Sequence, residues 1–187
     1  MLIILYSMVI MKIFYIVGAV SILAFHSKPA KDYREQSGIE VYVEQFSKQH
    51  KTWTEDNISV NKINRIFIDS LNNFYALHKD AFNNLVVRLE SVLDSVNGKR
   101  MASFECWEHY VDNKKLSAHI YAYVPDSLKK LYTGNDYVIN GTIEKFDIYH
   151  GAGYNKVDNS CDVGIITIQP ISILHLKRRS KTGNHDY

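Results

Sequence analysis

The first 25 residues of the chain are almost entirely apolar, and Lys12 is their only charged side chain. As a helix, a run of this length reaches about 37 Å and can cross a hydrocarbon core of about 30 Å. Read from Met11, the same run places a positive residue beside a start-type Met and then an apolar stretch, as in a secretory signal. We therefore predict that residues 1–26 are either a cleaved signal peptide, starting at Met1 or Met11, or an uncleaved membrane anchor.

Residues 27–37 are polar and contain Pro29, which predicts a linker. Residues 38–80 then show helical spacing. Over 38–53 the apolar positions follow a helical period, although alternation at its start also permits a strand. After Asn57 a clearer apolar stripe predicts an amphipathic helix with Ser59 as its cap. The stripe consists of Ile63, Ile66, Phe67, Leu71 and Phe74.

From residue 81 the pattern changes to the alternation of β-strands. The predicted strands are 85–96, 101–111, 116–124, 137–149 and 164–176. Asn97-Gly98 is a hairpin signal, and residues 112–115 are a polar turn. A short helix is expected at 125–132 and a long loop at 150–163. Gly141 predicts a bulge or a bend, and Pro170 predicts an edge or a kink.

The element order is strand, strand, strand, short helix, strand, strand. This is the order of an OB-fold, the five-stranded, partly open Greek-key barrel. We therefore expect an α+β chain in which an OB-like β-barrel over 81–176 is preceded by one or two helices that pack on it, over 38–80, and followed by a basic tail, 177–187.

Two stretches of the chain resemble small secreted bacterial OB-fold proteins with a tRNA-anticodon-binding-like domain. The first is IDSLNNFYALHKDAFNN leading into LVVRLESVLDSVNG, and the second is YVPDSLKKLYTGNDYVINGTIEKF. The resemblance covers residues 69–176. It implies the fold only, because OB barrels bind oligonucleotides, oligosaccharides and proteins alike.

The charge of the chain beyond residue 26 is close to zero. Removing Lys12 from the 22 Lys and Arg leaves 21 against 20 Asp and Glu, a net charge of +1. Such a chain has no global field that attracts polyanions. Thirteen Tyr and eight Phe with three Pro predict an ordered core.

Cys106 and Cys161 are the two cysteines of the chain. In an oxidising compartment a bridge between them would close about 55 residues and contribute about 4 kcal/mol in the chain-entropy model. Two separate thiols are the alternative. Neither belongs to a CxxC pair, so a redox or zinc site is not indicated.

Aromatic side chains gather on the second and third predicted strands, and lysines follow nearby. On an OB face, such rings could stack on bases or on sugar rings. Core packing and the ordinary preference of strands for aromatic residues are the alternative. The candidate binding residues are Trp107, Tyr110, His119, Tyr121, Tyr123, Lys129 and Lys130.

No motif for catalysis, metal binding or a cofactor is present. GxSxG, P-loop and GxGxxG motifs are absent, and the eight histidines lack HExxH spacing. The basic tail contains Lys177, Arg178, Arg179 and Lys181, which could touch anionic lipid or nucleic acid or remain solvated.

We therefore expect an exported, non-enzymatic binding module without a cofactor, periplasmic or anchored facing the periplasm, whose barrel engages a protein or glycan partner. The alternative is a barrel that binds single-stranded nucleic acid. A continuous positive groove lined by the aromatic residues would favour nucleic acid, and a mixed or acidic face would disfavour it. An exposed apolar patch or a free sheet edge would favour a protein partner.

Overall fold

A computed structural model describes residues 35–96, 99–106, 109–125, 128, 130–149 and 151–176 of the chain. The apolar run, the first part of the linker up to Arg34, the hairpin pair Asn97-Gly98 and the basic tail 177–187 lie outside the described residues. Among the helices that are described, none is long and apolar enough to cross a membrane.

In the part of the chain that is described, two helices precede the sheet. Helix α2 (Gly38–Gln49) is followed by a 3₁₀ turn, η1 (Lys51–Thr54), and by helix α3 (Asn57–Leu77). The helical interpretation of 38–53 is thus confirmed and a strand start there is wrong. The predicted cap of α3 is also wrong, because the Asp56 carboxylate accepts the backbone N–H groups of Ile58 and Ser59 at 2.8 and 2.9 Å. Ser59 lies inside the first turn and donates its own hydroxyl to Asp56.

Among the described residues that follow, seven strands form one sheet. The strands are β1 (Leu85–Val96), β2 (Lys99–Glu105), β3 (Tyr110–Val111), β4 (Lys114–Tyr123), β5 (Asp136–Asp147), β6 (Gly153–Asn155) and β7 (Ser160–His175).

Four of the predicted segments differ from the structure. The expected strand 101–111 is divided into β2 and β3, and the described residues within 125–132 form no helix. The expected loop 150–163 contains β6 and the start of β7. The turn before β4 is only two residues long, since Asp112 and Asn113 both have positive φ, as in a tight hairpin. Lys114 and Lys115 therefore belong to the strand.

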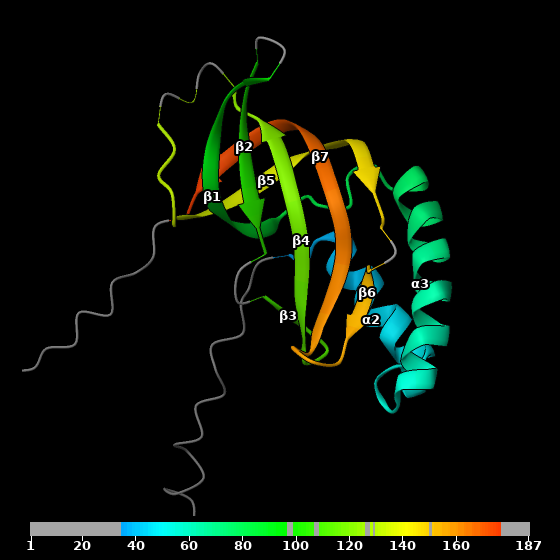
Figure 1. The fold of residues 1–187 in the computed structure, drawn as a ribbon. Coiled ribbons are helices and arrows are strands. Elements are labelled where there is room, and N and C mark those ends of the chain that lie inside the picture. The colour runs from blue at the N-terminus through cyan, green and yellow to red at the C-terminus, as the bar shows by residue number, and fades with distance from the viewer. Residues whose placement is uncertain are drawn as a thin grey trace, which may run out of the picture. The chain divides into compact units, whose positions relative to one another are not determined.

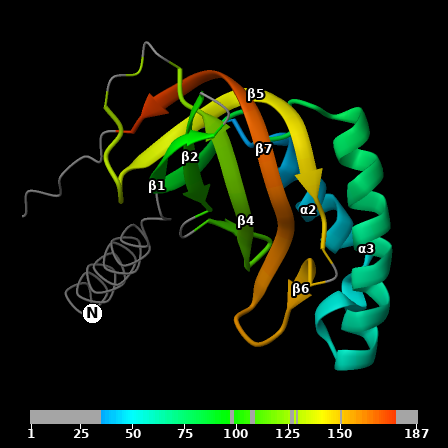
Figure 2. The same ribbon diagram turned by 45° about the horizontal axis from the view of Figure 1, so that its top comes forward.

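The longer strands pair around a ring that is partly closed. β1 pairs with β2, β2 with β4, β7 with β5, and β5 with β1, all antiparallel. These pairings form a row of strands that begins with β4 and ends with β7. The parallel pairing of β4 with β7 joins the two ends of this row. Figure 2 shows these strands following one another around the ring. A barrel-like sheet within an α+β chain is therefore confirmed.

Gly141 lies where the backbones of β5 and β7 approach closely. A Cβ atom at this position would lie 2.4 Å from the carbonyl oxygen of Gln169 and 2.7 Å from the Cα of Pro170. The register between the two strands also shifts between Asn140 and Gly141. The predicted bulge at Gly141 is thus confirmed, and Pro170 lies opposite it within β7.

The helices and the sheet share one hydrophobic core. Trp53 and Phe46 both pack on Phe67 of α3 with ring centroids 4.9 Å apart. Farther along α3, the buried Tyr75 donates its hydroxyl to the carbonyl oxygen of Val163 in β7 at 3.0 Å. Figure 1 shows α3 standing beside β6, at one side of the sheet.

The predicted disulfide is absent, because Cys106 and Cys161 are separate buried thiols. Cys161 lies in β7 opposite Leu116 of β4, and Cys106 follows the last residue of β2. β4 therefore lies between the two cysteine-bearing strands. Two strand spacings amount to about 9.5 Å, beyond the 6.8 Å or so that a disulfide spans between Cα atoms.

Candidate functional site

The outward side of β4 carries three of the predicted binding residues. Along this strand Leu116, Ala118, Ile120 and Ala122 are buried, whereas His119 is exposed and Tyr121 and Tyr123 are half-buried. This alternation follows from the period of two along a strand. The structure thus brings His119, Tyr121 and Tyr123 to one surface.

Neighbouring strands extend that surface. Glu105 of β2 lies opposite His119, and Ile165 and Thr167 of β7 lie beside His119 and Tyr121. Beyond β7, Lys145 and Asp147 of β5 lie opposite Thr167 and Ile165. We call this surface the β4 face. It consists of Glu105, Ser117, His119, Tyr121, Tyr123, Glu144, Lys145, Asp147, Tyr149, Asp162, Ile165 and Thr167.

Tyr123 is held in place at one end of the β4 face. The ammonium group of Lys99 lies 5.0 Å from the centroid of the Tyr123 ring. Partial removal from water raises the pKa of Tyr123, and the adjacent Glu144 carboxylate, to which it is hydrogen-bonded, raises it further. The ring is therefore oriented by two charged neighbours.

A second tyrosine, Tyr149, is held in place at the other end of the β4 face. Tyr149 donates its hydroxyl to the Asp162 carboxylate at 2.7 Å, and Asp162 also accepts the backbone N–H of Gly164 at 2.7 Å. Partial burial and the bond to the carboxylate raise the pKa of Tyr149 to about 12. Tyr149 therefore stays protonated at any physiological pH.

The charge of the β4 face is mixed. Glu105, Glu144, Asp147 and Asp162 are its carboxylates. Lys145 lies among them, Lys99 lies beside Tyr123, Lys115 continues the outward row of β4, and Arg88 of β1 lies opposite Glu105. A phosphate backbone needs several cationic partners. The described part of this face offers no continuous positive groove.

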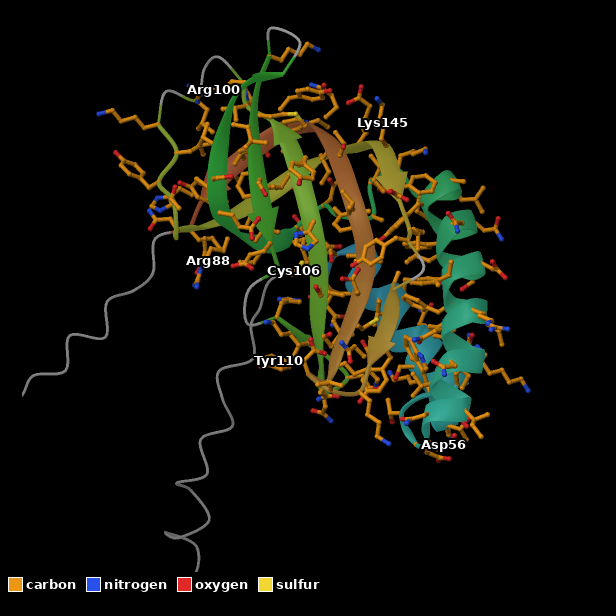
Figure 3. All side chains as sticks on the ribbon, in the orientation of Figure 1. Asp56, Arg88, Arg100, Cys106, Tyr110 and Lys145 are labelled. Atoms are coloured by element: carbon orange, nitrogen blue, oxygen red, sulfur yellow. The ribbon has the colours of Figure 1, made fainter. Side chains whose placement is uncertain are left out.

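The other predicted binding residues lie elsewhere. Tyr110 belongs to the short edge strand β3, is 63% exposed, and lies at the opposite end of the sheet from Lys145 (Figure 3). Lys130 is exposed in the segment between β4 and β5. Trp107 and Lys129 lie outside the described residues.

A buried polar cluster, which the sequence patterns did not indicate, joins α2 to the β3–β4 hairpin. Lys114, with 8% of its side chain exposed, donates to Ser47 at 2.7 Å and to the Asp112 carboxylate at 3.1 Å. Ser47 donates its hydroxyl to the same carboxylate. These bonds lower the pKa of Asp112, the bond from Ser47 first and that from Lys114 second. Because the lysine is ion-paired and donates to Ser47, it is not arranged to take a proton from this serine.

A second buried pair joins the start of α2 to the sheet. Glu40 accepts the backbone N–H and the hydroxyl of Ser37, its own N-cap, with one carboxylate oxygen. Its other oxygen lies 2.5 Å from Nε2 of His109, just before β3. The motif Ser-x-x-Glu at 37–40 is a capping box and was readable from the sequence. Its link to His109 depends on the tertiary fold.

A groove between α2 and α3 was also missed by sequence reasoning. It has a volume of about 590 Å³, and its wall is a ladder of rings. Phe74 stacks on Tyr42 with centroids 4.3 Å apart and packs against His78 at 4.6 Å with the two rings tilted by 34°. The other lining residues are mostly polar. They are Glu35, Gln36, Gly38, Val41, Gln45, Asp80, Ala81, Asn83 and Asn84.

No metal site is formed by the described residues, in which no three His, Cys, Asp or Glu side chains are grouped to hold an ion. Comparisons with protein-family models, with curated proteins and with solved structures give no match to this chain.

Proposed function

We propose that this chain is a non-enzymatic binding module of the cell envelope, in which an OB-like barrel engages a partner protein through the β4 face. The five longer strands would be the barrel strands, and β3 and β6 short additions to it. In OB-folds the ligand face lies over the second and third barrel strands, which here are β2 and β4. The apolar run at residues 1–26 supports the location in the envelope.

The observation that carries the proposal is the pair of half-buried tyrosines on β4, one of which, Tyr123, is oriented by charged neighbours. Tyrosine supplies a large rigid contact area at low entropic cost and is enriched among the residues that dominate interface energies. Tyr121 lies between Thr167 and Ser103 on the neighbouring strands, and Tyr123 is held by Lys99 and Glu144. A partner would therefore meet preformed anchors.

The carboxylates of the face indicate the chemistry of the partner. Glu105 and Asp147 flank the row that contains His119 and Ile165. Complementary charge steers association and fixes the register of a complex. The partner surface is accordingly one whose Lys or Arg side chains meet these carboxylates, and the mixed charge of the face disfavours a nucleic-acid ligand.

The test is site-specific photocrosslinking with the full chain in its own cells. A benzoylphenylalanine in place of Tyr121 should give a discrete crosslinked protein, whereas the same residue in place of Asn72, exposed on α3, should not. With the identified partner, Tyr121→Ala should weaken binding by about 30-fold, the effect of losing about 2 kcal/mol at a central anchor. Equal products from both positions, no product at Tyr121, or salt-sensitive binding of a single-stranded oligonucleotide would overturn the proposal.

A further inference from the structure

The groove between α2 and α3 is independent of the β4 face and has a different chemistry. It is concave, with a volume of about 590 Å³, within the 300–1,000 Å³ that small-molecule sites usually enclose. We propose that this groove binds a neutral, hydroxyl-rich ligand, namely a short stretch of oligosaccharide.

The aromatic wall supplies the apolar contact that a sugar ring needs. Tyr42, Phe74 and His78 form a ladder from two helices, and the stacked pair Tyr42 and Phe74 has an interplanar angle of 22°. Tyr42 is anchored by a hydrogen bond between its hydroxyl and Ser70. The ladder is therefore built into the fold and is present before any ligand arrives.

The rim supplies donors and acceptors for hydroxyl groups. Gln36 and Gln45 are exposed on the α2 side, and Asp80 lies on the side that follows α3. An amide offers both a donor and an acceptor, and a carboxylate accepts two or more bonds. A sugar hydroxyl both donates and accepts, so this mixture of groups matches it.

Other ligand classes fit the groove less well. Among the described residues that line it there is no Lys or Arg, and Glu35 and Asp80 contribute negative charge, which disfavours a phosphate or a carboxylate ligand. A purely apolar ligand would leave the amides and carboxylates of the rim without partners.

The amides of Asn83 and Asn140 hold the sheet side of the groove in position. The side-chain oxygen of Asn83 accepts the backbone N–H of Gly141 at 2.7 Å. Asn140 in turn accepts the backbone N–H of Asn84 at 2.8 Å. Because Gly141 is a close-approach point of β5 and β7, the floor of the groove is tied to the ring of strands.

The proposal is tested with the full chain in mild detergent, titrated with the neutral disaccharides cellobiose, maltose and N,N′-diacetylchitobiose, and with inorganic phosphate as the anionic control. We expect at least one disaccharide to bind and to shift the side-chain amide resonances of Gln36 and Gln45, and we expect phosphate to leave them unmoved. Loss of one hydrogen bond in Gln45→Ala should weaken binding about fivefold. Loss of the exposed ring in His78→Ala should weaken it by a similar factor.

Gln49→Ala is the matched control, since Gln49 is exposed on α2 but does not line the groove. This variant should bind as the unaltered chain does. Tyr121→Ala should also leave disaccharide binding unchanged, so that failure of this proposal and failure of the β4 face are distinguishable. No binding of any of the disaccharides, binding that Gln45→Ala and His78→Ala leave unchanged, or binding of phosphate at the same resonances would overturn the proposal.

Discussion

The contact of α2 with the sheet and the β4 face both place carboxylates next to hydrogen-bond donors, but they differ in their access to water. In the α2 contact, the side chains of Glu40, His109 and Lys114 are 4, 14 and 8% exposed. On the β4 face, His119 and Tyr149 are exposed and Tyr121 and Tyr123 are half-buried. The same kinds of groups are thus enclosed in one region and open in the other.

This difference separates polar groups that hold the fold together from polar groups that can meet a partner. Removing one member of a buried, paired set leaves the other charge without compensation, which is strongly destabilising. An exposed pair loses little, because water replaces the missing partner. The two regions should therefore respond differently to the removal of a single carboxylate.

Glu40→Ala should give the largest loss of stability. The change removes the N3 acceptor of the Ser37 capping box and the partner of His109 together, and we expect the free energy of unfolding to fall by about 3 kcal/mol. Chemical denaturation of the full chain measures the effect. Glu44→Ala is the control, because Glu44 lies one turn along the same helix in a surface pair with Lys48 and should cost at most about 0.5 kcal/mol. Equal losses in the two variants would remove the distinction between the regions.

Asp112→Ala should have the next largest effect, about 2 kcal/mol, below the usual cost of breaking a buried pair because the Asp112 side chain is 41% exposed. Lys114 would keep its bond to Ser47 but lose its counter-charge. Asp69→Ala, on the exposed side of α3, is the control. A loss below about 0.5 kcal/mol would show that this cluster behaves as a surface pair does.

The cluster of Ser47, Asp112 and Lys114 should also make the free energy of unfolding depend on pH in the acidic range. Hydrogen bonds from Ser47, then from Lys114, lower the pKa of Asp112 below its ordinary value of 3.8. The stabilisation is therefore fully present above pH 3.8 and is lost as the pH falls through the lower pKa of the folded state. Denaturation curves of the unaltered chain and of Asp112→Ala should accordingly converge at low pH. If the two chains still differ in stability by the same amount at low pH, the ionised Asp112 carboxylate is not the source of the stabilisation.

The sequence predicted the elements of the ring better than the contacts that close it. Alternation identified all five long strands, and Gly141 was correctly taken as a bulge, because both signals are local. The short strand β6 was missed and β3 was not separated from the second strand, since each is three residues or fewer and is defined by its pairing with β4 or β7. The division of the predicted strand 101–111 into β2 and β3 likewise depends on how each part pairs with β4.

The candidate site was predictable to a similar degree. His119, Tyr121 and Tyr123 stand at alternate positions of a predicted strand, so the period of two puts them on one side, as the structure has them. The α2–α3 groove could not be read from the sequence, because Tyr42 and Phe74 lie 32 residues apart and meet only through helix packing. The prediction of a disulfide was wrong for a similar reason. The order of strands in the sheet, and not the separation of the cysteines in the sequence, decides whether they are neighbours.

Tyr149→Phe should have the smallest effect and so gives the sharpest test of how open the β4 face is. Asp162 would lose one donor but keep the backbone N–H of Gly164, so the carboxylate is not left without a partner and we expect a loss of less than about 1 kcal/mol. In the unaltered chain, ¹³C NMR of the tyrosine rings should show Tyr149 titrating near pH 12, two units above the ordinary value of 10.0. A loss of about 2 kcal/mol or more would place this contact in the same class as the α2 cluster, and the β4 face would then be part of the fold's support and not a surface left open for a partner.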